Sequence, residues 1–75
     1  MVSRHSKEYQ QLLDQLKSAR EQTGLTQRQV ADKLKMPQSK VSRIETGETK
    51  IDPIDLGKFC HLYEKSASYF VPSLR

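Results

Sequence analysis

Hydrophobic residues recur along the chain at the spacing of α-helices. In residues 6–22 the apolar side chains fall at intervals of three and four, and similar spacing returns in residues 27–34, 38–46 and 53–63. Such intervals place apolar side chains on one face of a helix with 3.6 residues per turn. No stretch alternates apolar and polar residues in the way of a half-buried strand. The pattern therefore predicts an all-α protein.

Residues suited to helix ends stand between these segments. Ser6, Thr26 and Asp52 are suited to N-caps, because a side-chain oxygen can accept a hydrogen bond from an unpaired first-turn amide. Gly24 and Gly47 are suited to the left-handed position that follows many helices. A last short helical turn is expected from residue 66 to the proline at 72. Residues 1–5 are expected to form a flexible polar arm, which either contacts phosphate or has no role.

Residues 26–46 predict two short helices joined by a tight turn. The first would cover 27–34, and the second would start near Gln38 and end before Gly47. Pro37 cannot continue the first helix but suits the start of the second. This is the spacing of a helix-turn-helix, whose second helix enters the major groove of DNA.

The second of these helices has two different faces. At about 100° per residue, Val41, Ile44 and Glu45 fall on one side and are expected to face the core. The other side carries only polar side chains, namely Gln38, Ser39, Ser42, Arg43 and Thr46. Arginine can bridge two acceptors of guanine and glutamine can pair with adenine, so this side is a candidate reading face. An ordinary solvated helix face is the alternative.

One cation falls in an apolar stripe. In the first helix Arg20 lies about 20° from Tyr9 on the helical wheel, on the side of the buried leucines. An unpaired buried charge costs several kcal/mol, so Arg20 requires an acidic partner. Glu45 is the acid that points toward the interior from the second helix of the pair. We therefore expect an ion pair between Arg20 and Glu45.

Composition and charge narrow the class of protein. The 75 residues carry a formal net charge of +4, and the excess lies within residues 1–50, which contain the candidate reading face. A basic protein of this size favours a polyanionic partner such as nucleic acid. We expect one domain over residues 1–75. A single cysteine excludes an internal disulfide framework, and no segment is apolar enough for a membrane span or a signal peptide, so a cytoplasmic, nucleoid-associated location is expected.

The segment from about residue 12 to residue 71 resembles the phage Cro/repressor (XRE-like) helix-turn-helix family. The matching residues are Arg20, Gly24-Leu25-Thr26-Gln27, Val30-Ala31, Leu34, Gln38-Ser39, Val41-Ser42-Arg43-Ile44-Glu45 and Gly47. The order of residues 37–39 and 42–48 is similar to that of small stand-alone bacterial regulators. Lys35 and Glu64 depart from the pattern, since the family usually has glycine at the first position and often near the second.

The resemblance implies a compact five-helix, lambda-repressor-like domain that binds operator DNA as a dimer. It also implies roles for particular residues. Base contacts would come from Gln38, Ser39, Ser42 and Arg43, and phosphate contacts from Gln27, Lys40, Thr46 and Lys50. The expected dimer surface is the C-terminal region with Tyr69, Phe70, Val71 and Leu74; alternatively Phe70 and Val71 close the core and leave only the other two.

Catalytic, metal and cofactor chemistry find no support in the sequence. Cys60 and His61 are adjacent and therefore point in different directions on a helix, so they lack ligand spacing. No glycine-rich phosphate loop or nucleophile–base arrangement is present. We therefore expect no cofactor, no metal and no enzymatic activity. The expected function is that of a transcriptional repressor, and the alternative is a protein-interaction module or antitoxin that has retained the fold.

Overall fold

The computed structural model describes residues 6–74, which form five α-helices and a final 3₁₀ turn, without a strand among them. The elements are α1 (Lys7–Thr23), α2 (Gln27–Leu34), α3 (Gln38–Thr46), α4 (Pro53–Tyr63), α5 (Ala67–Phe70) and η1 (Pro72–Leu74). The predicted all-α, five-helix architecture is confirmed. The predicted arm of residues 1–5, with Arg4 and His5, lies outside the described residues.

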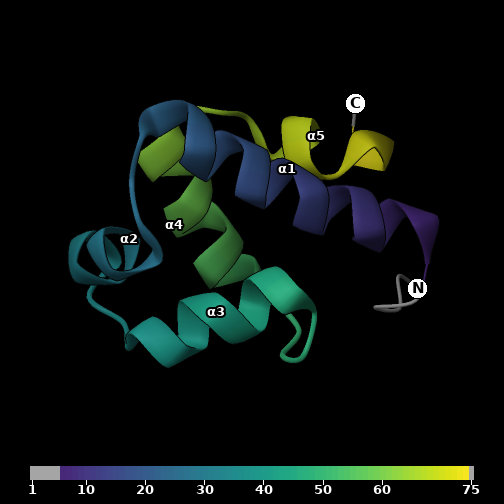
Figure 1. Cartoon of the computed structure of the whole chain (residues 1–75). Coiled ribbons are helices and arrows are strands. Elements are labelled where there is room, and N and C mark those ends of the chain that lie inside the picture. The colour runs from purple at the N-terminus through teal and green to yellow at the C-terminus, as the bar shows by residue number, and fades with distance from the viewer. Residues whose placement is uncertain (1–5, 75) are drawn as a thin grey trace.

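The helices enclose one core. Figure 1 shows α1 along one side of the molecule with α5 beside it, α3 on the opposite side, and α4 between them. The buried hydrophobic residues are Tyr9, Leu12, Leu13, Leu16, Ala19, Val30, Ala31, Val41, Ile44, Phe59, Tyr63 and Phe70. They come from all five helices, so no helix pair has a separate core. Burial of this shared apolar surface holds α2 and α3 against α1.

The helices begin at the N-caps expected from the sequence. The side chains of Ser6, Thr26 and Asp52 accept hydrogen bonds from the amides of residues 9, 29 and 55, at 3.0, 3.1 and 2.7 Å. Thr26 and Gln29 form a complete capping box, because the Gln29 side chain also accepts from the Thr26 amide at 2.8 Å. Pro37 differs slightly from expectation, since it occupies the N-cap of α3 with an extended backbone.

Two helices end at non-glycine residues in the left-handed conformation. Gly24 and Gly47 take positive φ after α1 and α3, as expected, but Lys35 and Glu64 both have φ of 56° after α2 and α4. A side chain in this conformation costs on the order of 1 kcal/mol relative to glycine. The turn geometry is thus the one that glycine favours, and the chain accommodates the strain at both positions.

The C-terminal segment closes the core. Phe70 is fully buried, Tyr69 and Val71 are half-buried, and Leu74 is 60% exposed. The edge of the Tyr69 ring meets Phe70, with centroids 5.0 Å apart. Phe70 is therefore unavailable to a second copy, which agrees with the alternative in which Phe70 closes the core and not with the one that placed it on the dimer surface. Pro72 does not end helical structure altogether, because it begins the 3₁₀ turn η1.

Candidate nucleic-acid interface

The helix-turn-helix is formed by α2 and α3, joined through residues 35–37. The left-handed Lys35 turns the chain at the end of α2, and the amide of Met36 donates to the carbonyl of Ala31 at 3.0 Å. Met36 packs partly buried against the core. Pro37 then directs the chain into α3 with an extended backbone. The two helices of the motif therefore have a fixed connection.

The buried side of α3 is the one expected from its periodicity. Val41 and Ile44 have no exposed surface, and Glu45 is 2% exposed. The polar positions lie on the outside, where Gln38, Ser39, Arg43 and Thr46 are exposed and Ser42 is half-buried. The core thus fixes the rotation of α3 about its own axis. A continuous polar strip remains available along its outer surface, and it contains the side chains predicted to read bases.

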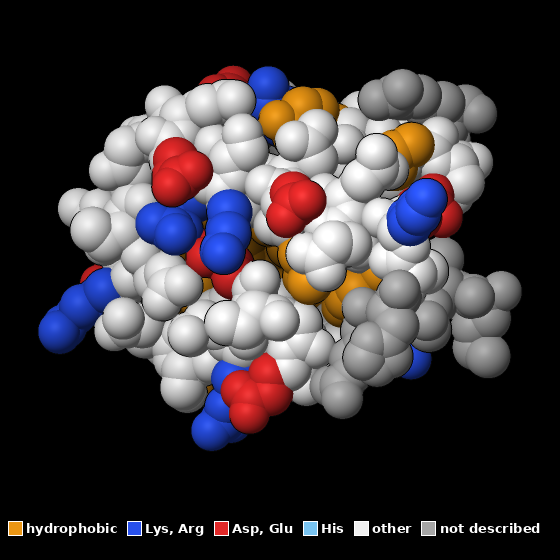
Figure 2. Space-filling model, turned by 45° about the vertical axis from the view of Figure 1, so that its right-hand side comes forward, with side chains coloured by type: hydrophobic (Ala, Val, Ile, Leu, Met, Phe, Trp, Pro, Cys, Tyr) orange, Lys and Arg blue, Asp and Glu red, His pale blue; other side chains and the backbone are white. Residues whose placement is uncertain are grey.

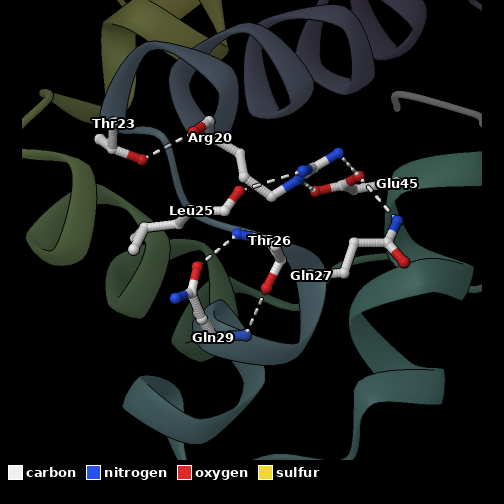
Figure 3. Close-up of polar contacts among 7 residues, drawn as sticks. All are labelled: Arg20, Thr23, Leu25, Thr26, Gln27, Gln29 and Glu45. Atoms are coloured by element: carbon white, nitrogen blue, oxygen red, sulfur yellow. Dashed lines mark hydrogen bonds and ion pairs between the residues drawn. The ribbon is translucent and has the colours of Figure 1, made fainter.

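The ion pair between Arg20 and Glu45 joins α1 to α3. Nε of Arg20 donates to Oε2 of Glu45 at 2.8 Å, and a second guanidinium nitrogen donates to Oε1 at 3.2 Å (Figure 3). The guanidinium also donates to the carbonyl of Leu25 at 3.2 Å, just before α2 begins. The hydrogen bond to Glu45 is the main reason that the pKa of Arg20 is raised. Arg20 thus joins α1 both to α3 and to the segment that leads into α2.

Gln27 completes this network from the first turn of α2. Its side-chain nitrogen donates to Oε1 of Glu45 at 3.0 Å (Figure 3). The carboxylate of Glu45 therefore accepts hydrogen bonds from both α1 and α2. The sequence did not predict this contact, because the resemblance assigned Gln27 to a DNA phosphate. That phosphate contact stays a prediction. In the free protein the side-chain amide of Gln27 is already oriented by its hydrogen bond to Glu45.

Lys40 forms a second ion pair that the sequence did not predict. Its ammonium lies 2.9 Å from Oδ2 of Asp55, whose side chain is only 7% exposed. Asp55 belongs to the first turn of α4, so this pair joins α3 to α4. The hydrogen bond to Asp55 raises the pKa of Lys40. On the helical wheel Lys40 falls beside Ile44, at the border of the buried side of α3. This position is the feature of the sequence that could have indicated a contact between Lys40 and another helix.

The other predicted DNA contacts lie on the surface. Arg43 is exposed and its Nε is 3.7 Å from a carboxylate oxygen of Glu48, which is a long surface contact. The hydroxyl of Thr46 donates to the carbonyl of Arg43 at 3.2 Å and accepts from the amide of Glu48 at 3.5 Å. Lys50 is exposed in the loop after α3. The DNA contacts assigned to these residues stay predictions.

The charge on the surface is mixed. On the face in Figure 2, basic and acidic side chains are interspersed, and hydrophobic side chains reach the surface in small separate areas. Within residues 6–74 no group of three or more metal-ligating side chains could hold a metal ion. None of the helices in this part of the chain is long and apolar enough to cross a membrane.

Comparison with known proteins identifies the family. A model of the helix-turn-helix domain family matches residues 11–67, which is more than half of the chain and includes both helices of the motif. No curated protein and no solved structure matches the chain. The chain therefore belongs to the helix-turn-helix domain family, whose members are DNA-binding domains.

Proposed function

We propose that the protein is a sequence-specific transcriptional regulator that represses by occupying an operator. The observation that carries this proposal is the division of α3 into a buried side and an exposed polar side with Gln38, Ser39 and Arg43. These side-chain types supply the donors and acceptors that distinguish base pairs in the major groove. We also propose that residues 1–75 form one domain of the phage Cro/repressor (XRE-like) branch, without enzymatic activity.

Ser42 and the phosphate contacts complete the proposed interface. Ser42 is short enough to let the backbone of α3 approach the bases. Gln27, Thr46 and Lys50 would hold the sugar–phosphate backbone on either side, and such contacts orient a protein without selecting a sequence. The ammonium of Lys40 already pairs with Asp55, so a phosphate contact by Lys40 has to compete with this ion pair.

Binding as a two-fold dimer to a palindromic operator is part of the proposal. A few base contacts worth about 1–3 kcal/mol each cannot select one site from a genome, whereas two half-sites about one helical turn apart can. The exposed Leu74, with the half-buried Tyr69 beside the core, is the remaining candidate for the dimer surface at the C-terminus. A cytoplasmic location with the DNA follows from this function.

Selection of binding sites from random duplex DNA tests the proposal. The purified protein should enrich one motif, repeated in inverted orientation with half-site centres about 10 base pairs apart. Titration of the enriched duplex at fixed salt, against a scrambled duplex of the same composition, then measures the specificity ratio. Equal affinity for the two duplexes would exclude sequence-specific regulation. A single unrepeated motif would retain sequence reading but exclude the palindrome.

A further inference from the structure

A groove of about 520 Å³ lies on the surface between the end of α2 and the outer side of α4. Its apolar lining consists of Leu34, Ile54 and the backbone at Gly57. Ile54 is 72% exposed, which makes it the most exposed of the large hydrophobic residues in the part of the chain described. No predicted DNA contact lines this groove, so the reading face on α3 does not account for it.

The outward side of α4 has the spacing of a helix-binding surface. Ile54, Gly57, Lys58 and His61 follow each other at intervals of three, one and three, which aligns them in one stripe along the helix. A Cβ at Gly57 would have nothing within 4 Å, so the fold itself does not require glycine there. Glycine in the middle of a helix weakens it, and one reason for which glycine is found at such a position is the close approach of a ligand to the backbone. An occupant that lies directly against α4 would supply that group.

Basic side chains surround the apolar lining. Lys33, Lys35 and Lys58 line the groove, and within residues 6–74 none of the three forms an ion pair. A second copy placed symmetrically on this groove would bring lysines against lysines, which is unfavourable. DNA would offer phosphates to the lysines but no apolar group to cover Ile54. A protein segment with acidic and apolar side chains matches both properties.

We propose that this groove binds an acidic amphipathic helix of a partner protein. One or two apolar side chains of the partner would cover Ile54 and Leu34, and its acidic residues would pair with Lys33, Lys35 and Lys58. This is the helix-in-groove mode of recognition, in which apolar anchors at helical spacing give affinity and flanking charges give orientation. The inference concerns a surface distinct from the proposed DNA contacts and stands independently of sequence-specific DNA binding.

A fluorescent synthetic peptide tests the groove directly. The probe is a helical peptide with leucine along one side and glutamate elsewhere, and binding is followed by fluorescence anisotropy and by NMR shifts of the full chain. We expect shifts centred on Ile54, Gly57 and His61. Gly57→Leu should fill the groove and weaken binding about tenfold or more, whereas the matched variant Gly57→Ala, which adds only a methyl group, should weaken it clearly less. Lys58→Glu is a second variant that should also weaken binding.

Control experiments distinguish an acidic amphipathic helix from DNA and from a second copy of the chain as the occupant of the groove. A peptide with lysine in place of every glutamate should not bind, and one with serine in place of every leucine should bind about tenfold more weakly or worse. Equal peptide affinity of Gly57→Leu and Gly57→Ala would overturn the proposal. Competition by a short DNA duplex for the groove would assign it to phosphate instead. Self-association of the parent that disappears in Gly57→Leu would assign it to a second copy.

Discussion

The ammonium of Lys40 lies 2.9 Å from a carboxylate oxygen of Asp55, so a side chain of the proposed recognition helix holds the first turn of α4. The two partners differ in exposure to solvent, since the Lys40 side chain is 42% exposed and that of Asp55 is 7% exposed. Removing the lysine would leave the nearly buried carboxylate without its cation. Solvent reaches the lysine side and reduces this effect, but it does not remove the need for a partner.

Lys40→Ala should therefore lower the melting temperature, whereas Lys50→Ala should leave it unchanged. The salt dependence of DNA binding distinguishes the two lysines further. A lysine that contacts phosphate contributes about one unit to the slope of log affinity against log salt. We expect Lys50→Ala to reduce the slope by about this amount and Lys40→Ala to reduce it less. Equal reductions would show that Lys40 leaves Asp55 and contacts phosphate in the complex.

Arg43→Ala should weaken operator binding by about 1–3 kcal/mol and relax selection at one base pair of each half-site. The guanidinium is exposed and its contact with Glu48 is long. Arg43 can therefore leave Glu48 and contact a base with little loss of free energy. Lys17→Ala, on the exposed side of α1, is the matched control for loss of one positive charge. A uniform loss of affinity on all DNA sequences would count against base readout by Arg43.

Glu45→Gln should destabilise the fold by about 2–4 kcal/mol, because it leaves the partly buried Arg20 without a counter-charge. An amide has the same shape, but in either orientation its NH₂ group would replace one of the two oxygens that accept hydrogen bonds from Arg20 and would face an N–H group of that guanidinium. Chemical unfolding measures the loss, and DNA affinity per folded molecule should change less. Glu21→Gln, at an exposed position of α1, should have little effect. Unaltered stability of Glu45→Gln would refute a stabilising role for the pair.

Tyr63→Phe should leave stability unchanged or raise it by about 1 kcal/mol, because the buried hydroxyl has no hydrogen-bond partner among the described residues. Its ring would keep its stacking on Phe59, where the ring centroids are 6.0 Å apart. A loss of more than about 1 kcal/mol on thermal unfolding would show that the hydroxyl is bonded in solution.

The ionisation of the Tyr63 hydroxyl should be detectable at alkaline pH. Burial raises the pKa of Tyr63 to about 12 from its ordinary value of 10. Since the folded pKa is the higher one, the stability associated with the neutral hydroxyl falls as the pH rises from 10 toward about 12. Absorbance titrations of the parent and of Tyr63→Phe should differ by one tyrosine step near pH 12.

The contact between Glu8 and the C-terminal turn should depend on acid pH. A carboxylate oxygen of Glu8 accepts from the amide of Ser73 at 2.8 Å. Hydrogen bonds from the side chain of Ser73 and from this amide lower the pKa of Glu8 below its ordinary value of 4.5. Because the folded pKa is the lower one, the contact is fully present above pH 4.5 and is lost as the pH falls through the folded value. The NMR shift of the Ser73 amide should follow this titration, and Glu8→Gln should abolish it.

Local patterns in the sequence determined the helices and the inner side of α3. Helix periodicity and capping residues located the elements, since both depend on residues within one or two turns of each other. The Arg20–Glu45 pair was also predictable, because a cation in one apolar stripe and an acid in another leave few alternatives. The candidate reading face on α3 follows from the same wheel, and the sequence alone predicts its composition.

Only the tertiary structure decided which polar groups meet across helices. Lys40 and Asp55, and Gln27 and Glu45, come from different helices, and their meeting depends on how those helices cross. The packing likewise placed Phe70 in the core and left Ile54 exposed, although both are apolar and lie in predicted helices. A helical wheel gives the direction in which a side chain points from the axis of its helix. Burial depends on whether another helix lies in that direction.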